Sequence, residues 1–531
     1  MKRKLQPLLF ASLFAFSAVT LSAQPGSLDK KFGDDGFVLS SAGNSTNNLG
    51  YDVVVQPDGK TVISGKSQVS SSLQAAILMR YKLNGDPDSS FGRNGVVAQS
   101  FTNQFDNFSV LKIQQDGKFI VAGLSIRHDT NFVLFARYNA DGTIDNSFRT
   151  KTTAIKYYGF GAVATDIAIQ PDNKILLQIN NNQPITFLAQ TQVERYNEDG
   201  TIDRSFGNNG NFTYTGNFWF TKFTTDRFGR IICMSGDAGL TNLLRLLPNG
   251  RPDKTFGING LATKQVSPYD GTQNIIAQPD GKIIICGFLQ ASNFVDVLFS
   301  VYRFDANGTL DSTFNGTGIN STKINGLDYP YDVALQPDGK LVATGYTISH
   351  NGPTYMTLMR YNTRNGHTDS TFGNNGLDTV TTTWDGKSYS YGVACAVSDD
   401  GARIVVTGQQ GGKSFLRNDF LTARFIARGA TPLLATAAST NDLEIYKAGV
   451  ASVYPNPVKN IATISFSLPE STNVRVSIAN MQGQVLSTIY NGYLNKGNQT
   501  MQANVSNLAS GTYNVLIQAG GRSSYIKLVK L

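Results

Sequence analysis

Cysteine is scarce in this sequence, with three residues among 531. Cys233, Cys286 and Cys395 stand in apolar runs, without a Cys-x-x-Cys pair or the spacing typical of zinc ligands. Counted from the glycine of the preceding turn, Cys233 comes fourth and Cys286 fifth, which would place them on opposite faces of a strand. We interpret the cysteines as small buried hydrophobic residues and predict neither a disulfide nor a metal site.

A long hydrophobic run is lacking beyond the N-terminus. Residues 1–23 contain three early positive charges, an apolar run from Leu8 to Leu21 and small residues before Ala23, which is the plan of a cleaved signal peptide. A membrane anchor is the alternative, but this run is too short to cross about 30 Å of hydrocarbon. We therefore expect export from the cytoplasm and no transmembrane segment.

An excess of one charge is absent from most of the chain, although the formal net charge is +8. Residues 1–23 carry +3, and residues 451–531 carry six basic side chains against Glu470. The intervening residues 24–450 are therefore close to neutral and would not attract a polyanion. The charge pattern argues against nucleic-acid binding.

Glycine is abundant, with 52 residues, and it punctuates runs rich in Val, Ile, Thr, Tyr and Phe, as in β-proteins. One stretch, residues 303–314, recurs along the chain with an Asn/Asp-Gly turn and an Asp-x-x-Phe motif. Seven near copies, 50 to 59 residues apart, place a phenylalanine at Phe32, Phe91, Phe148, Phe206, Phe256, Phe314 and Phe372. The chain is therefore a repeat protein.

Each full unit predicts four short antiparallel strands. A strand such as 331–335 is followed by a Gln-Pro-Asp-Gly-Lys turn and a second strand such as 341–345. A variable loop leads to a third strand, and a Gly-x-x-Gly step after the phenylalanine opens the fourth. We predict an all-β fold with a seven-bladed β-propeller at residues 24–426.

The two ends of the repeat array complement each other. The first unit begins in mid-repeat at residue 28, and the last one stops at Phe425 without its own Asp-x-x-Phe motif. We expect one blade to be assembled from N- and C-terminal strands, which closes the ring. An open β-solenoid, the alternative, would need polar caps that the sequence lacks.

An arginine ends the third strand of every unit, and in six units it comes eight or nine residues before the aspartate of the same unit. We predict an arginine–carboxylate pair in each blade, with Arg424 meeting Asp29 at the closure. The seven phenylalanines are expected to pack between blades. The arginines are Arg80, Arg137, Arg195, Arg245, Arg303, Arg360 and Arg424.

Residues 427–450, rich in Ala, Thr, Ser and Asn, are predicted to be a linker. The repeat period is lost after them. Residues 451–531 contain alternating strands at 462–466, 474–478 and 513–517, which predict a small β-sandwich.

The repeats resemble the delta-60 repeat family of bacterial β-propellers, through their Asp-x-x-Phe motifs and Gln-Pro-Asp-Gly-Lys turns. The likeness covers about 400 residues. The sequence departs from the family pattern in the turns at 226–230 and 398–403, and at Phe148, which no glycine follows. These departures bear on local turn geometry rather than on the fold.

The C-terminal module resembles the type A sorting domain of the type IX secretion system of Bacteroidota. The resemblance is carried by Tyr454, Pro455, Asn456, Pro457, Gly511, Tyr513 and Lys527. It implies contact with the type IX machinery through residues 451–531 and a location outside the cell, secreted or on the outer-membrane surface. An ordinary adhesive β-sandwich is the alternative.

Four polar residues share one position in the repeat, seven residues before the turn glycine or its equivalent Asn173: Asp52, Asp166, Asn274 and Asp332. If their strand is innermost, they ring a mouth of the central channel and could bind a ligand. Polar capping of the strand starts is the alternative. The variable loops between second and third strands are further candidates for recognition.

Catalytic and metal-binding motifs are not found. His128, His350 and His367 fall in loops or turns of different units, so we expect exposed residues and no histidine metal site. No Gly-x-Ser-x-Gly or phosphate-binding loop occurs. Turns such as 139–145 resemble calcium loops but lack their terminal glutamate, so turn chemistry explains them and calcium stays a weaker alternative.

These observations predict a monomeric, non-catalytic binding or adhesion module for an unidentified extracellular glycan or protein, without a cofactor. A carbohydrate-active hydrolase or lyase with channel carboxylates as acid and base is the alternative from another class. A structural surface protein is the third possibility.

Overall fold

Every regular element in the described part of the chain is a β-strand, as the all-β prediction requires. The computed structural model describes residues 24–428 and 452–531, apart from 43–46, 71, 129, 149–154, 157–161, 171, 183–188, 238, 267–269, 294, 351, 385–386, 412–417, 469–470, 480–484 and 520–521. The predicted signal peptide and nearly all of the predicted linker lie outside the described residues. The chain divides into two compact units, Met1–Thr431 and Pro432–Leu531.

In the first unit, the described strands pair antiparallel in seven groups of four, which we call blades. The first strands are β2 (Asn48–Val55), β7 (Val110–Ile113), β11 (Val163–Ile169), β15 (Lys222–Thr225), β19 (Asp270–Ala277), β23 (Gly326–Leu335) and β29 (Ser390–Val397). The second strands are β3 (Thr61–Gln68), β8 (Phe119–Arg127), β12 (Ile175–Asn182), β16 (Ile231–Asp237), β20 (Ile283–Gln290), β24 (Lys340–Ser349) and β30 (Arg403–Gly411).

The third and fourth strands complete the blades. The third strands are β4 (Gln74–Tyr81), β9 (Thr130–Tyr138), β13 (Ala189–Tyr196), β17 (Leu240–Leu246), β21 (Val297–Phe304), β25 (Thr354–Asn362) and β31 (Asn418–Ile426). The fourth strands are β5 (Val96–Gln99), β10 (Ile155–Lys156), β14 (Asn211–Gly216), β18 (Leu261–Gln265), β22 (Ile319–Thr322), β26 (Leu377–Val380) and β1 (Phe37–Ser40). Short strands β6 (Phe105–Asp106), β27 (Thr383–Trp384) and β28 (Lys387–Ser388) lie in the connections.

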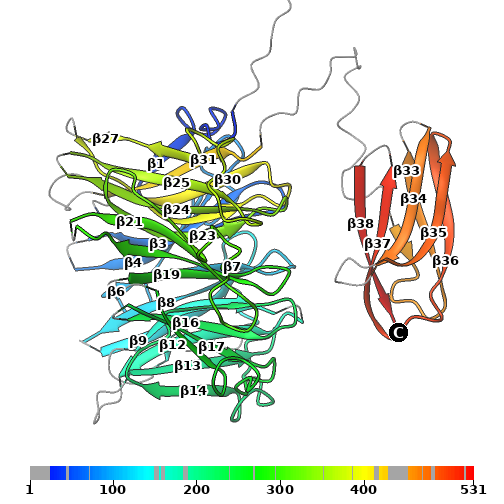
Figure 1. Cartoon of the computed structure of the whole chain (residues 1–531), viewed down its shortest axis with the longest axis horizontal. Coiled ribbons are helices and arrows are strands. Elements are labelled where there is room, and N and C mark those ends of the chain that lie inside the picture. Colours follow the sequence, from blue (N-terminus) through cyan, green and yellow to red (C-terminus); the bar gives the residue numbers. More distant parts are fainter. Residues whose placement is uncertain are drawn as a thin grey trace, which may run out of the picture. The chain divides into compact units, whose positions relative to one another are not determined.

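The blade at the chain ends is built from both termini. Strand β1 pairs antiparallel with β31, with Phe37 opposite Ala423, so the N-terminal strand becomes the outer strand of the last blade (Figure 1). A side-chain contact adds to the backbone pairing, because an Nη of Arg424 lies 3.0 Å from a carboxylate oxygen of Asp29. The predicted closure is present in the structure.

The hairpin between first and second strands has the expected turn. In the turn at 336–340, Gly339 has a φ of 82°, and its N–H donates to the carbonyl of Gln336 at 2.9 Å. The two departing turns keep this geometry, since Gly229 and Gly401 have φ of 73° and 65°. Only glycine adopts this left-handed conformation freely, so the turn survives the other sequence changes.

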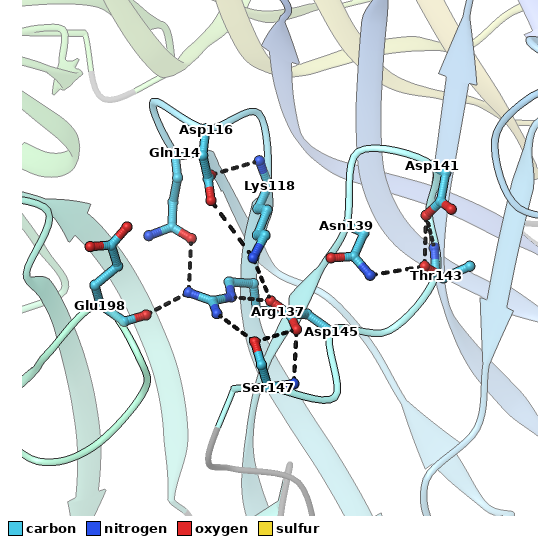
Figure 2. A network of polar contacts seen from close by, with 10 residues as sticks. All are labelled: Gln114, Asp116, Lys118, Arg137, Asn139, Asp141, Thr143, Asp145, Ser147 and Glu198. Atoms are coloured by element: carbon cyan, nitrogen blue, oxygen red, sulfur yellow. Dashed lines mark hydrogen bonds and ion pairs between the residues drawn. The ribbon is translucent and has the colours of Figure 1, made fainter.

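Six of the seven third-strand arginines join two blades through one buried guanidinium, and Figure 2 shows the example of Arg137. Arg137 on β9 donates from Nε to Asp145 at 2.8 Å, and its guanidinium lies over the Phe148 ring, 4.7 Å from the centroid. Its Nη1 donates to the carbonyl of Glu198, which belongs to the next blade. Lys118 of the hairpin turn lies 3.0 Å from the same aspartate, so one carboxylate receives two cations.

The predicted arginine–aspartate pair occurs in every blade. The pairs and their shortest nitrogen–oxygen distances are Arg80–Asp88 2.8 Å, Arg137–Asp145 2.8 Å, Arg195–Asp203 2.7 Å, Arg245–Asp253 2.8 Å, Arg303–Asp311 2.6 Å, Arg360–Asp369 2.7 Å and Arg424–Asp29 3.0 Å. The seven phenylalanines are at most 1% exposed. Burying a phenylalanine side chain stabilises the fold by about 1.5–3 kcal/mol.

The packing of the propeller extends to Ala427, the first residue of the predicted linker. Ala427, assigned to the linker, is fully buried, and its N–H donates to the carbonyl of Ala402 at 2.9 Å. Its own carbonyl accepts a hydrogen bond from Arg360. Arg360 belongs to the neighbouring blade, so the flanking sequence alone could not reveal this contact.

The second unit consists of two antiparallel sheets. One sheet contains β32 (Ser452–Tyr454), β33 (Ile461–Leu468) and β36 (Gly497–Asn504). The other contains β35 (Val485–Leu494), β34 (Thr472–Ala479), β37 (Gly511–Ala519) and β38 (Arg522–Lys530). Residues from both sheets, including Ile464 and Val515, share one buried core, as in the predicted β-sandwich.

Replacing Arg303 with methionine is expected to lower the free energy of unfolding by about 3 kcal/mol, because the substitution leaves buried Asp311 without its guanidinium partner. Urea denaturation of the purified chain measures the change. Arg251→Met is the matched control, since Arg251 is exposed in a turn and its loss should cost less than about 0.5 kcal/mol. Equal effects of the two substitutions would contradict the role assigned to the guanidinium.

Candidate functional site

The first strands surround a central cavity of about 430 Å³. Every first strand contributes to its wall, together with Ser109 just before β7, so the first strand is the innermost one, as the sequence analysis required. The lining residues are 51–53, 109, 112, 166–169, 222–225, 273–276, 331–333 and 393–395. A volume of this size is in the range of small-molecule sites.

The four polar residues singled out in the sequence all line this cavity. The register of each first strand against its second strand shifts immediately before them, as between Gly50 and Asp52 and between Pro330 and Asp332. Such a bulge re-aims the side chain that follows it. In these four blades, the side chain that follows the bulge lies on the cavity wall.

The three aspartates at this position hydrogen-bond across neighbouring blades. One oxygen of Asp52 accepts the N–H of Val53 at 2.8 Å, and the other accepts the N–H of Leu111 in the next blade at 2.9 Å. Asp166 and Asp332 repeat the arrangement, and their contacts are Ile167 at 2.9 Å with Phe223 at 3.2 Å, and Val333 at 2.7 Å with Cys395 at 2.7 Å. Each carboxylate thus connects adjacent innermost strands.

Asn274 shares the contact with its own strand but, among the described residues, lacks the contact with a backbone N–H of the next blade. Its Oδ1 accepts the N–H of Ile275 at 2.8 Å, while its Nδ2 donates to Oδ1 of Asp332. The amide therefore contacts the side chain of the next blade, where the aspartates contact backbone. Capping of the strand, which the sequence analysis held as the alternative, accounts for these contacts without a ligand.

Two lysines that the sequence analysis did not predict, Lys112 and Lys222, also line the cavity. Nζ of Lys112 lies 3.3 Å from Asp52, and Nζ of Lys222 donates to the carbonyl of Thr165 at 3.1 Å. Lys222 occupies the same repeat position as the aspartates, so a full alignment of the repeats could have revealed it. Lys112 lies two residues beyond that position, and only the structure brings it to the cavity.

The cavity walls carry charges of both signs that nearly cancel. Asp52, Asp166 and Asp332 oppose the two lysines. Burial raises the pKa of Asp332 to about 6. Burial would lower the pKa of Lys112, but the three carboxylates outweigh it and raise the pKa above its ordinary value. The site therefore carries little net charge near neutral pH.

The scarce residues lie where the sequence analysis expected them. The three cysteines are buried and free, and burial raises the pKa of each thiol. The three histidines are exposed, and Nε2 of His350 lies 2.8 Å from Asp296, a contact that the sequence did not indicate. Within the described residues, no group of three or more His, Cys, Asp or Glu side chains is arranged to hold a metal ion.

The calcium-like turns use their carboxylates within the turn. Oδ1 of Asp141 accepts hydrogen bonds from the N–H and the hydroxyl of Thr143, at 2.9 and 2.7 Å (Figure 2). This is the usual Asx arrangement of a tight turn. Turn chemistry accounts for these contacts.

The sorting-motif residues lie at one end of the β-sandwich and on its strands. Tyr454, Pro455, Asn456 and Pro457 are exposed, and Oδ1 of Asn456 accepts the N–H of Val529 at 2.8 Å. Gly511 begins β37. The backbone of Lys527, on β38, pairs with that of Asn514 on β37. Tyr513 packs in the core and donates its hydroxyl to Ala509 at 2.8 Å. The motif therefore joins the two chain ends of this module.

The fold and the C-terminal module define a secreted β-propeller. Residues 452–531 match the family described as the secretion system C-terminal sorting domain. Four segments, 56–91, 114–148, 278–314 and 336–372, match the family described as a domain of unknown function (DUF5122) beta-propeller. The chain thus combines DUF5122 propeller repeats with a type IX sorting domain, which indicates secretion and attachment to the cell surface.

Other comparisons add little to this. No curated protein matches the sequence. Similar solved structures include an alpha-L-arabinanase from Penicillium chrysogenum in complex with arabinobiose, with 10% identity over 76% of this chain and 98% of that chain and a TM-score of 0.34. The polysaccharide lyase Uly1 is 11% identical over 77% of this chain and 98% of that chain, with a TM-score of 0.42. Prolyl oligopeptidase B from Galerina marginata is 12% identical over 81% of this chain and 54% of that chain, with a TM-score of 0.36. Scores this low carry no argument about function.

A search for membrane-spanning helices finds none among the residues that the structure describes.

The raised pKa of Asp332 predicts a pH-dependent stability. A carboxyl whose folded pKa is raised stabilises the fold fully below its unfolded pKa of about 4, and this stabilisation is lost as the pH rises through about 6. Between about pH 4 and pH 7, the free energy of unfolding should fall by about 3 kcal/mol relative to Asp332→Asn. Denaturation of both proteins across this range measures the difference, with the exposed Asp280→Asn as control for loss of a charge. A gap that is constant with pH would refute the prediction.

Proposed function

We propose that this protein is a non-catalytic binding or adhesion module at the cell surface, with its ligand site at the central cavity of the propeller. The observation that carries the proposal is the engagement of the cavity aspartates. Each of Asp52, Asp166 and Asp332 already accepts two backbone N–H groups, one from its own strand and one from the next blade. Their first task is to hold the innermost strands together.

This engagement argues against acid–base catalysis. A glycosidase needs two carboxyl groups that approach a glycosidic bond and exchange protons with it or with water. A carboxylate that accepts two backbone hydrogen bonds is held in one orientation, and its remaining lone pairs suit the recognition of hydroxyl or amide groups. The lysines add donors, since an ammonium group has three and each lysine contact described above uses one.

One observation favours the alternative, an extracellular carbohydrate-active hydrolase or lyase. Burial raises the pKa of Asp332 to about 6, and a carboxyl whose pKa approaches the working pH can act as a general acid. Its position on the cavity wall would bring it near a bound substrate. A structural surface protein without a small ligand is the third candidate, and it rests on the same inter-blade contacts.

The export route follows from the two termini. Residues 1–23 would direct the chain across the inner membrane as a cleaved signal peptide, and residues 451–531 would then engage the type IX machinery. The delta-60 resemblance and the sorting domain suggest an origin in Bacteroidota. We propose a monomer that binds an extracellular glycan or protein and neither nucleic acid nor a cofactor. Calcium is a variable in the binding experiment described next.

Binding and catalysis are separated by one experiment. The purified full chain is applied to glycan and protein arrays, with calcium or with EDTA, and each ligand that binds is then incubated with the protein and analysed for products. We expect saturable binding and intact ligand, because the cavity carboxylates are engaged by the backbone. Cleaved product would favour the enzyme, and absence of binding would favour the structural role.

Export through the sorting domain is tested by truncation. A chain that ends at residue 451 should accumulate inside the cell envelope, because it lacks the module that the type IX machinery recognises. Immunoblots of medium, surface-protease-treated cells and periplasm measure its location. The full chain carrying Phe228→Ala, a surface change in the propeller, is the control. Normal surface display of the truncated chain would contradict the assignment.

A further inference from the structure

Five aromatic rings form a continuous cluster beside the cavity. They are Phe288 on β20, Tyr329 and Tyr331 on β23, Tyr346 on β24 and Tyr391 on β29. Ring centroids lie 5.3 Å apart for Phe288 and Tyr329, 5.6 Å for Tyr329 and Tyr346, 5.3 Å for Tyr331 and Tyr346, and 4.9 Å for Tyr346 and Tyr391. The cluster, which we call the aromatic patch, spans three consecutive blades.

The aromatic patch is only half-buried. All five side chains have intermediate exposure, in contrast to Tyr302 and Tyr361, which are fully buried in the core between the blades. Core packing therefore does not account for the patch as it does for those tyrosines. A contiguous, partly exposed group of large aromatic side chains is a common mark of a binding surface.

The aromatic patch is continuous with the cavity. Tyr331 belongs to both, since it lines the cavity and stacks on Tyr346 with an interplanar angle of 26°. Tyr329 and Tyr346 lie toward the ends of β23 and β24 that are remote from the 336–339 turn, because they pair with each other while Leu335 pairs with Leu341 beside the turn. A ligand that enters the cavity from this end meets the patch first.

We infer that the aromatic patch and the cavity together bind the end of a neutral carbohydrate chain. The inference rests on the proposed binding function and gives the chemical class of its ligand. Sugar rings present apolar C–H faces that pack on tyrosine rings, and their hydroxyls suit the amide, carboxylate and ammonium groups of the cavity wall.

Charge and size favour this ligand over others. The wall carries three aspartates and two lysines, so it offers neither a polyanion nor a polycation a field of one sign. A folded protein partner would need an interface of more than about 1,000 Å² and no deep polar cavity. A polyhydroxylated chain can satisfy the polar groups in the cavity, which an apolar ligand would leave desolvated and unpaired.

The test uses the purified full chain and titration calorimetry with neutral hexasaccharides, namely cellohexaose, xylohexaose, mannohexaose and fully N-acetylated chitohexaose. We expect at least one to bind saturably, and Tyr346→Ala and Tyr391→Ala to weaken that binding about tenfold or more. Tyr346→Phe, which keeps the ring, should change the affinity by less than about threefold. Thermal melts verify that each variant is folded.

Phe228→Ala is the matched control, because Phe228 is an exposed aromatic residue in the hairpin turn at the opposite ends of the first and second strands. Its affinity should equal that of the parent chain. If the alanine variants at 346 and 391 bind as the parent does, the patch is not the carbohydrate site. If the hexasaccharides fail while alginate, a polyanion, or an arrayed protein binds, the ligand class is wrong and the binding function stands. If neither the hexasaccharides, nor alginate, nor an arrayed protein binds, the carbohydrate inference and the proposed binding function are both wrong.

Discussion

The guanidinium that ends each third strand is the interaction on which the rest of the propeller depends. It is buried, so it needs a partner on every side, and it finds an aspartate and a phenylalanine in its own blade. Further partners lie in the next blade, as when Arg303 donates to the carbonyl of Thr363. Because one charge is satisfied only when two blades are in place, neighbouring blades stabilise each other and the array favours a closed ring.

In every blade, a lysine or arginine from the turn between the first and second strands lies beside the aspartate. This cation is kept in the two turns whose sequences depart from the repeat. Five units place a lysine of this turn beside the aspartate, for example Lys282 at 2.6 Å from Asp311. In the turns without that lysine, Arg230 lies 4.0 Å from Asp253, and Arg403 lies 2.6 Å from Asp29. The positive charge persists although the sequence of the turn does not. At the closure, Arg403 and Arg424 both reach the same aspartate, across the two ends of the array.

The sequence predicted what is local and repeated, and missed what is neither. Strands, hairpin turns and six of the seven arginine–aspartate pairs involve residues within about ten positions of one another, so the repeated copies make their pattern visible. The second acceptor contact of Asp52 reaches Leu111, 59 residues away, and the pair of His350 with Asp296 occurs in one place only. Lys112 belongs to a single blade, and the aromatic patch, which spans three blades, occurs at one place in the ring. The contact of Asp52 recurs for Asp166 and Asp332 but joins distant residues, whereas the other features do not recur, so the repeat period carries no information about them.

The same distinction separates the framework from the candidate site. The framework contacts recur around the ring, whereas the position that begins the cavity wall holds aspartate, asparagine, lysine, valine or alanine according to the blade. The two lysines come from β7 and β15, and the aromatic rings come from β20, β23, β24 and β29, so the cavity differs chemically from one side to the other. A symmetric scaffold with unlike walls can hold a ligand in one orientation, because only one rotation brings an apolar sugar face to the rings and hydroxyls to the ammonium groups. The blades that depart from the repeat at these positions are therefore the ones to which specificity should be assigned, and the arginine contacts are what allow them to differ without loss of the fold.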